Sequence, residues 1–243
     1  MSWYSDWFNS EYYLKVYSHR NESEAERLVQ LIVENVSLPI NSSIIDMACG
    51  SGRHSIVFAR KGYDVTAVDL SERLVTEAKM IAEKSKVNID FVLSDILEFK
   101  SDKKFDLALN LFTSFGYFES DDENFRLLLK AYELLNTDGY FVIDYFNINY
   151  LLKNLVPTSI LSENWLRIIQ NRSIQGNRVR KDISIENNKS VERYYESVRL
   201  YNYSDMINFI NKAGFCKIKE YGDYNGSNFN DDSSPRLIIF AKK

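Results

Sequence analysis

The sequence predicts an α/β fold with a mostly parallel, seven-stranded sheet, helices on both faces and a small antiparallel β insertion. Two observations predict the sheet. Between residues 43 and 144, short apolar runs alternate with segments whose apolar residues recur at helical spacing. Two more apolar runs, 215–218 and 237–240, follow a helical segment near the C-terminus. Because strands that alternate with helices are joined by right-handed crossovers, the first five strands should be parallel and covered on both faces.

The individual elements are placed by periodicity and by their end signals. Ser71 is a capping residue at the start of a helical pattern, and Gly62 and Gly214 end two others. The expected helices are 22–36, 53–61, 71–84, 121–135 and 203–213. The expected strands of the main sheet are 44–48, 63–68, 89–93, 105–109, 140–144, 215–218 and 237–240.

Four regions follow from this pattern. Residues 160–202 alternate in the manner of short antiparallel strands, with turns at 175–177 and 187–188. The many aromatic residues near the N-terminus either fix a leading helix to the core or line a ligand pocket. Composition alone favours packing against the core for most of them. We expect an aromatic N-terminal helical cap at 1–36, the α/β core at 37–150, the antiparallel insertion at 151–202, and a C-terminal helix with closing strands at 203–243.

Composition narrows the class of protein. The chain has 243 residues, of which 45% are hydrophobic and 26% charged, so we expect one large domain, or a domain with a substantial insertion, that buries a real core. A net charge of −4 argues against general affinity for nucleic acid. Cys49 and Cys216 show neither disulfide nor metal-ligand spacing, and no signal peptide or membrane span is recognisable. We expect a cytoplasmic protein without a metal or a membrane partner, either a monomer or a homodimer.

Polar residues follow the strands of the expected core. The carboxyl ends of parallel strands share one edge, and ligands bind where the strand order reverses along that edge. The polar residues expected at this edge are Asp46, Asp69, Asp95, Asn110 and Asp144.

Residues 46–52, Asp-Met-Ala-Cys-Gly-Ser-Gly, join the first strand to the next helix. Glycines in such a turn let the backbone pass close to a ligand, beside the free N–H groups of a helix N-terminus. A dinucleotide fingerprint would need a third glycine where this chain has Ser55, which disfavours a nicotinamide-dependent oxidoreductase. No Gly-Lys-Ser/Thr follows either, which excludes a Walker P-loop.

The turn resembles the acid-x-Gly-x-Gly-x-Gly motif of class I S-adenosylmethionine-dependent methyltransferases, which have a Rossmann-like fold. Asp46 matches the acid, Gly50 and Gly52 match two glycines, and Ala48 stands in place of the other. The segments "FTSFGYF", "YYESVRLY" and "SPRLIIFAKK" are also similar to those of uncharacterised bacterial small methyltransferases.

This resemblance implies S-adenosylmethionine as cofactor, S-adenosylhomocysteine as product, and a set of binding residues. Asp69 would accept the ribose hydroxyls, and Asp95 the adenine amine, through charge-assisted hydrogen bonds. An arginine before the core pairs with the cofactor carboxylate in related enzymes, which points to Arg20. The expected cofactor-binding residues are Tyr17, Arg20, Asp46, Ala48, Gly50, Gly52, Asp69, Leu70, Ser94, Asp95, Ile96, Asn110 and Leu111.

Several of these residues have a structural alternative. Asp69 and Asp95 are each placed to cap the segment that follows, although Ser71 can already cap the helix after Asp69. Arg20 has Glu22 and Glu24 nearby for a surface ion pair.

The resemblance implies methyl transfer to N or O of a small molecule. The Asn/Asp-Pro-Pro-Tyr signature of base methylation on nucleic acids is absent, because residues 110–113 read Asn-Leu-Phe-Thr. A cofactor-binding module or sensor without chemistry is the alternative function. The basic run Arg172, Arg178, Arg180 and Lys181 would either grip an acidic substrate or form a solvated hairpin. No general base is evident, and the candidates for a catalytic role are His19, Tyr117, Glu196 and Arg199.

Overall fold

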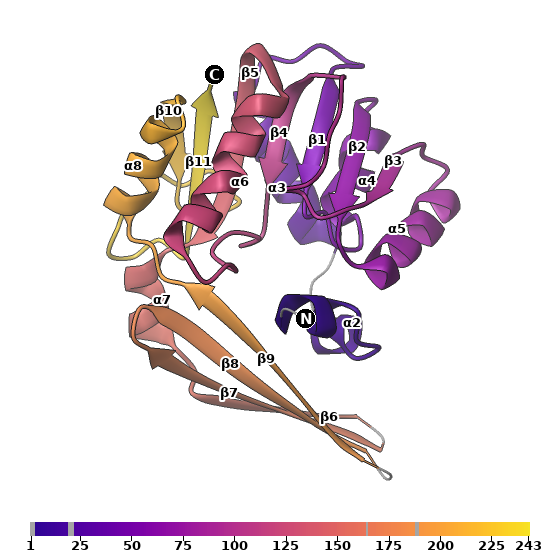
Figure 1. The fold of residues 1–243 in the computed structure, drawn as a ribbon, viewed down its shortest axis with the longest axis vertical. Coiled ribbons are helices and arrows are strands. Elements are labelled where there is room, and N and C mark those ends of the chain that lie inside the picture. Colours follow the sequence, from indigo (N-terminus) through magenta and orange to yellow (C-terminus); the bar gives the residue numbers. More distant parts are fainter. Residues whose placement is uncertain (1–2, 19–21, 164, 188–189) are drawn as a thin grey trace.

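The core of the computed structural model, which describes residues 3–18, 22–163, 165–187 and 190–243, is a seven-stranded sheet (Figure 1). Its strand order is β10-β11-β5-β4-β1-β2-β3, and every neighbouring pair from β5 to β3 is parallel. β11 is antiparallel to both β5 and β10. These strands are β1 (Ser43–Met47), β2 (Asp64–Asp69), β3 (Asp90–Leu93), β4 (Phe105–Asn110), β5 (Leu135–Phe146), β10 (Cys216–Tyr221) and β11 (Arg236–Lys242). The prediction of a seven-stranded, mostly parallel sheet is confirmed.

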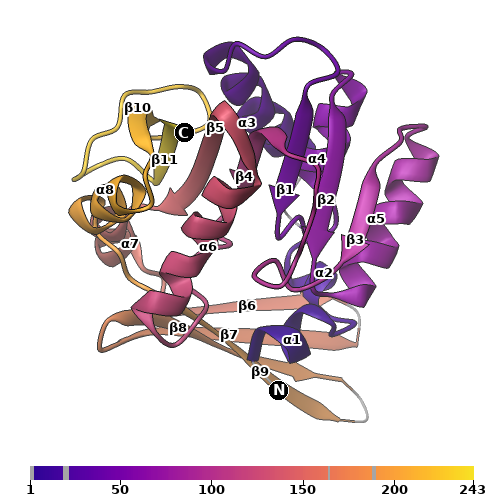
Figure 2. The same ribbon diagram turned by 45° about the horizontal axis from the view of Figure 1, so that its top comes forward.

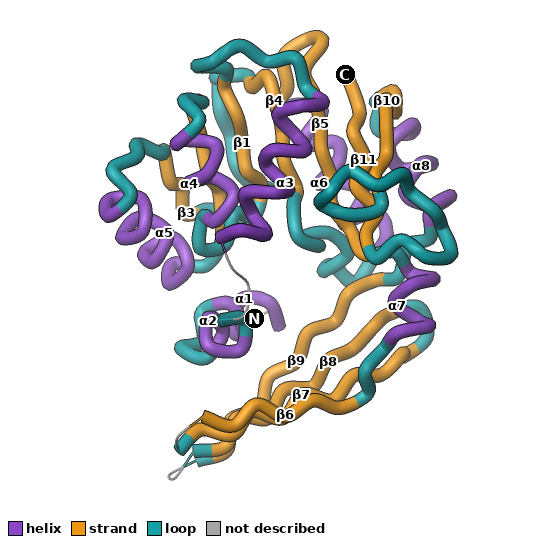
Figure 3. Tube along the Cα trace, turned by 180° about the vertical axis from the view of Figure 1, so that it is seen from behind, coloured by secondary structure: helices purple, strands orange, loops and turns teal. Residues whose placement is uncertain are grey.

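Helices cover both faces of this sheet because each presents one apolar stripe to it. On the face seen in Figure 3, Leu28 of α3 and Phe58 of α4 belong to one buried cluster with the strands. On the other face, Leu128 of α6 and Ile210 of α8 belong to a second cluster. The bounds are α3 (Glu22–Asn35), α4 (Arg53–Arg60), α5 (Glu72–Lys84), α6 (Asp121–Leu134) and α8 (Tyr203–Lys212). The expected N-cap of α5 is also present, since the hydroxyl of Ser71 accepts from the N–H of Leu74 at 3.2 Å.

The strand order reverses at β1, which lies between β2 and β4. The chain runs outward to β2 and β3 on one side and to β4 and β5 on the other. The loops that leave β1 and β4 therefore diverge at the carboxyl edge and open a crevice between them, the usual ligand position in this class of sheet.

A second, four-stranded antiparallel sheet lies across that edge (Figure 2). We call it the cap sheet, and its strand order is β6-β7-β8-β9. It fulfils the prediction of an antiparallel insertion, although a short helix, α7 (Ile148–Asn154), precedes it. Its strands are β6 (Thr158–Glu163), β7 (Leu166–Gln175), β8 (Arg178–Glu186) and β9 (Val191–Arg199).

The N-terminal region, which we expected as one cap over 1–36, divides between the two sheets. Two short helices, α1 (Trp3–Phe8) and α2 (Tyr13–Val16), pack on the cap sheet, where Trp7 is buried with Ile168 and Ile183. The next helix, α3, packs on the core instead. The aromatic residues therefore fix the first two helices to the cap sheet rather than to the core.

Hydrogen bonds join the cap sheet to the loop after β4. The N–H of Arg199 donates to the carbonyl of Gly116 at 2.8 Å. The guanidinium of Arg178 donates to the carbonyls of Gly116, Tyr117 and Phe118 at 3.0–3.2 Å. Part of the basic run is thus used to hold this loop.

Gly116 supplies a test of that junction. Its φ is +89°, and a Cβ atom there would lie 3.2 Å from the carbonyl oxygen of Arg199. Gly176 is the matched control, because its φ is +59° and its Cβ position is open. We expect Gly176→Ala to lower the free energy of unfolding by about 1 kcal/mol. Gly116→Ala should lower it by about 2–4 kcal/mol, since crowding adds to backbone strain. Urea denaturation measures both, and equal losses would contradict the close contact.

Candidate active site

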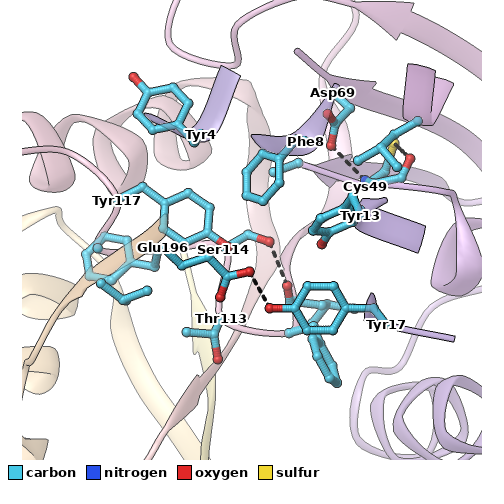
Figure 4. Close-up of a pocket in the computed structure, with 18 of the residues that line it drawn as sticks. Tyr4, Phe8, Tyr13, Tyr17, Cys49, Asp69, Thr113, Ser114, Tyr117 and Glu196 are labelled. Carbon is cyan, nitrogen blue, oxygen red and sulfur yellow. Dashed lines mark hydrogen bonds between the residues drawn. The ribbon is translucent and has the colours of Figure 1, made fainter. Parts of the chain in front are cut away.

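A cavity of about 800 Å³ lies between the carboxyl edge of the core, the helices α1 and α2, and the cap sheet. This volume is within the ~300–1,000 Å³ typical of ligand pockets. Figure 4 shows Asp69 at the core side, Glu196 at the cap side with the ring of Tyr17 beside it, and the ring of Phe8 between the two carboxylates.

The glycine turn forms the core side of the cavity. Gly50 has φ +58°, and a Cβ atom at this position would meet no atom within 4 Å, so the backbone is exposed to the cavity. Gly52 has φ +75°, and glycine is favoured there for a second reason, because a Cβ atom would lie only 3.1 Å from Cβ of Ala78 on α5. Ala48 also has positive φ, +67°, and accepts the strain that a glycine would avoid.

Asp69, at the end of β2, is tied to this turn. Its Oδ2 accepts from the N–H of Gly50 at 2.7 Å, and its Oδ1 accepts from the N–H of Ser71 at 2.9 Å. Burial raises the pKa of Asp69, although these two hydrogen bonds oppose the shift. Each carboxylate oxygen keeps a second lone pair for a hydroxyl donor from the cavity.

Asp46, at the end of β1, is nearly inaccessible, and its Oδ2 accepts from the hydroxyl of Ser55 at 2.5 Å. Burial raises the pKa of Asp46 from 3.8 to about 6, with the Ser55 hydrogen bond lowering it and the charge of Asp69 raising it. Ser55 stands where a dinucleotide site would have glycine, and here it fixes the acid of the turn.

The other expected cofactor residues divide into two groups. Asp95 lines the cavity but also caps the next turn, since its Oδ1 accepts from the N–H of Leu97 at 2.9 Å. Asn110 does not line the cavity; its amide donates to the carbonyls of Met47 and Ser114 at 3.1 and 3.2 Å. Gly52 lies behind the turn. The remaining expected residues that line the cavity are Tyr17, Asp46, Ala48, Gly50, Asp69, Leu70, Ser94, Ile96 and Leu111.

Glu196 lines the cap side of the cavity and joins it to both N-terminal helices. Its carboxylate accepts from Nε1 of Trp7 at 2.7 Å and from the hydroxyl of Tyr17. It also pairs with Nζ of Lys181 at 2.6 Å. Burial would raise the pKa of Glu196, but Lys181 and the two hydrogen bonds outweigh it and hold this pKa below its usual value. Such a carboxylate is a weak base.

The other catalytic candidates differ in position. Tyr117 lines the cavity and packs its ring on Trp3, with 5.3 Å between centroids. Arg199 lies outside the lining and forms a bidentate pair with Asp121 at 2.9 and 3.2 Å. His19 and Arg20 lie outside the described residues.

One ionic cluster beside the cavity involves residues that sequence reasoning did not join. The buried carboxylate of Asp144 accepts from Nε of Arg236 and from the hydroxyl of Tyr224, both at 2.8 Å. Arg236 lines the cavity and also donates to the hydroxyl of Thr113 at 2.9 Å. The signal in the sequence was Asp144 itself, a charge on a strand that the pattern places in the core.

Comparisons with known proteins agree with this geometry. The profile of the methyltransferase domain family matches residues 44–139. A Geobacillus sp. protein whose name assigns it as a methyltransferase is 25% identical over 209 residues, covering 82% of this chain and 84% of the relative.

Two solved structures have similar folds. An S-adenosylmethionine-dependent methyltransferase from Clostridium acetobutylicum has a TM-score of 0.80 at 18% identity, covering 95% of both chains. The sugar N-methyltransferase KedS8 from Streptoalloteichus sp. has a TM-score of 0.74 at 18% identity, covering 97% of this chain and 93% of its own.

The fold and the glycine turn thus define a methyltransferase of the Rossmann-like type. The protein is an S-adenosylmethionine-dependent methyltransferase with the class I fold, as its motifs predicted, and S-adenosylmethionine is its cofactor. The residues present fit that cofactor, because open backbone at Gly50 and the carboxylate of Asp69 face one cavity.

The part of the chain that the structure describes lacks two features. No group of three or more His, Cys, Asp or Glu side chains there is arranged to hold a metal ion. No helix there has both the length and the apolar character that crossing a membrane requires.

Asp69 provides a direct test of the cofactor site. Hydrogen bonds to a charged group contribute about 1.5–3 kcal/mol, which corresponds to about 10- to 100-fold in Kd. We therefore expect Asp69→Asn to weaken S-adenosylmethionine binding by about that factor in calorimetry. Asp64→Asn is the control, since Asp64 begins the same strand in an exposed pair with Lys103. Unchanged binding by Asp69→Asn would refute the assignment.

The raised pKa of Asp46 predicts that the stability of the protein depends on pH. Its folded pKa of about 6 lies above its unfolded value of 3.8, so the native state binds more protons between these values. Stability from this group is therefore lost as pH rises from about 4 to 6, by up to about 3 kcal/mol. Asp46→Asn should unfold at higher urea concentration than the parent at pH 7.5, with the advantage shrinking near pH 4. Parallel pH profiles for the two proteins would contradict this.

Proposed function

We propose that this methyltransferase acts on a nitrogen or oxygen atom of a small-molecule acceptor. The observation that carries the proposal is the single cavity lined both by the glycine turn and by the cap sheet. Its volume of about 800 Å³ is large enough for a nucleoside cofactor beside an acceptor of modest size.

S-adenosylmethionine supplies a methyl group on a positively charged sulfur atom. On the core side, we assign Asp69 to the ribose hydroxyls and Asp95 to the adenine amine. The exposed backbone at Gly50 leaves room for the amino acid part of the cofactor. Asn110 has a positioning role, because it joins the end of β1 to the loop after β4 and so fixes Leu111 at the cavity wall.

On the acceptor side, aromatic rings from α1, α2 and the loop after β4 enclose the reacting groups. Methyl transfer needs the acceptor atom in line with the methyl group and water kept away. Tyr117, packed against Trp3 and Phe8, is well placed to supply such a wall. We infer that it orients the acceptor without moving a proton.

A nitrogen acceptor fits these residues better than a hydroxyl. An amine attacks as its free base, whereas a hydroxyl gains more from a positioned base. The carboxylate of Glu196 already accepts from Trp7, Tyr17 and Lys181 and has a lowered pKa. A fold shared with a sugar N-methyltransferase is consistent with this preference. The two free cysteines fit a reducing compartment such as the cytoplasm.

The test is turnover of methyl-labelled S-adenosylmethionine against a mixture of small amines and alcohols, followed by mass spectrometry. We expect products heavier by one methylene, formed on amines, and loss of turnover in Asp69→Asn. A protein that binds the cofactor and transfers no label to any acceptor would instead be a binding module or sensor.

A further inference from the structure

Three charged side chains form one row across the cap sheet. Arg172 on β7 is directly opposite Lys181 on β8, and Lys181 is directly opposite Glu196 on β9. Directly opposite residues point to the same face of a sheet, and all three line the cavity. The row therefore presents two cations and one anion to the acceptor side.

Glu196 neutralises only one of the two cations. Its carboxylate lies 2.6 Å from Nζ of Lys181, and both side chains are less than one-fifth exposed. Within the described residues, Arg172 forms no ion pair. Its guanidinium donates instead to neutral groups, including the hydroxyl of Ser159 and the side-chain carbonyl of Gln170, both at 3.0 Å.

This arrangement costs stability in the protein alone. Like charges directly opposite on neighbouring strands repel each other, and partial burial reduces the screening by water. A neutral residue at position 172 would avoid that cost. Holding a second cation beside Lys181 is explained if an anion from the cavity joins the row.

The remaining charges of the cavity give that anion a direction. Apart from Glu196, the carboxylates that line the described cavity come from the core edge and α5. They are Asp46, Asp69, Glu77 and Asp95. Two other arginines line the cavity and already pair with carboxylates, Arg53 with Glu24 and Arg236 with Asp144. An anionic group is therefore repelled from the cofactor end and attracted to Arg172.

We propose that the acceptor carries an anionic oxygen group, a carboxylate or a phosphate, which binds Arg172 with Lys181 beside it. This proposal rests on the proposed function and specifies its acceptor class. The planar guanidinium has five N–H donors, and its Nε–H has no partner within the described residues. Arginine suits such groups because two of its donors can meet two oxygens at once.

The first experiment measures binding without turnover, in the presence of S-adenosylhomocysteine. Benzoate and phenyl phosphate are the anionic probes, and benzamide is the neutral one, each titrated by calorimetry. We expect the parent to bind one anionic probe at least tenfold more tightly than benzamide, and the better of the two identifies the group. Arg172→Gln should remove that preference, while binding of S-adenosylhomocysteine stays within twofold.

Arg167→Gln is the matched control. Arg167 is on the same strand but pairs with Glu186 and does not line the cavity. It should behave as the parent, and Arg172→Lys should recover part of the preference. Circular dichroism confirms that each variant is folded. Equal binding of all three probes, or full anion preference in Arg172→Gln, overturns the proposal.

A second experiment separates this proposal from the proposed function. Methyl transfer is compared between 3-aminobenzoate and 3-aminobenzamide. Transfer to both amines with equal KM values, and a KM for 3-aminobenzoate that Arg172→Gln leaves unchanged, overturns the anion proposal and leaves the methyltransferase function intact. Anion binding that depends on Arg172, without transfer to any small acceptor, supports the anion site and overturns the small-acceptor function.

Discussion

The hydrogen bond between the N–H of Gly50 and the carboxylate of Asp69 is the contact on which the cofactor edge depends. It joins the turn after β1 to the end of β2, and the two residues are 19 positions apart in the chain. Other groups hold the same turn: Ser55 fixes Asp46 from behind, and Asn110 ties the end of β1 to β4. The strained Ala48 is tolerated because these bonds over-determine the backbone around it.

The acceptor side is built by different means. A four-stranded antiparallel sheet and two short helices close the cavity. The sheet contacts backbone groups of residues 116–118, and the end of α1 contacts the core where the hydroxyl of Ser71 donates to the carbonyl of Phe8 at 2.9 Å. The ion pair of Lys181 and Glu196, with Trp7 and Tyr17, ties the helices to the sheet. Hydrogen bonds and an ion pair thus position the acceptor side of the cavity, and aromatic side chains pack behind it.

The sequence predicted the core edge because parallel strands bring their carboxyl ends together whatever the details of packing. Asp46, Asp69 and Asp95 were identified in this way, and all three line the cavity. The sequence could not predict that Arg172, Lys181 and Glu196 form one row, because a shift of one residue in the pairing of antiparallel strands turns a side chain to the other face. Arg236 was missed because its partner Asp144 is 92 residues away and only the β5–β11 register joins them.

The separation of apolar clusters has a consequence for how this enzyme can diversify. Trp3, Trp7 and Val16 share their cluster with the cap sheet and with none of the strands that carry the nucleoside-binding residues. Substitutions that reshape the acceptor wall therefore change the packing free energy of the cap sheet and its two helices. The packing free energy of the core stays nearly constant. The two ends of one pocket are free to evolve at different rates.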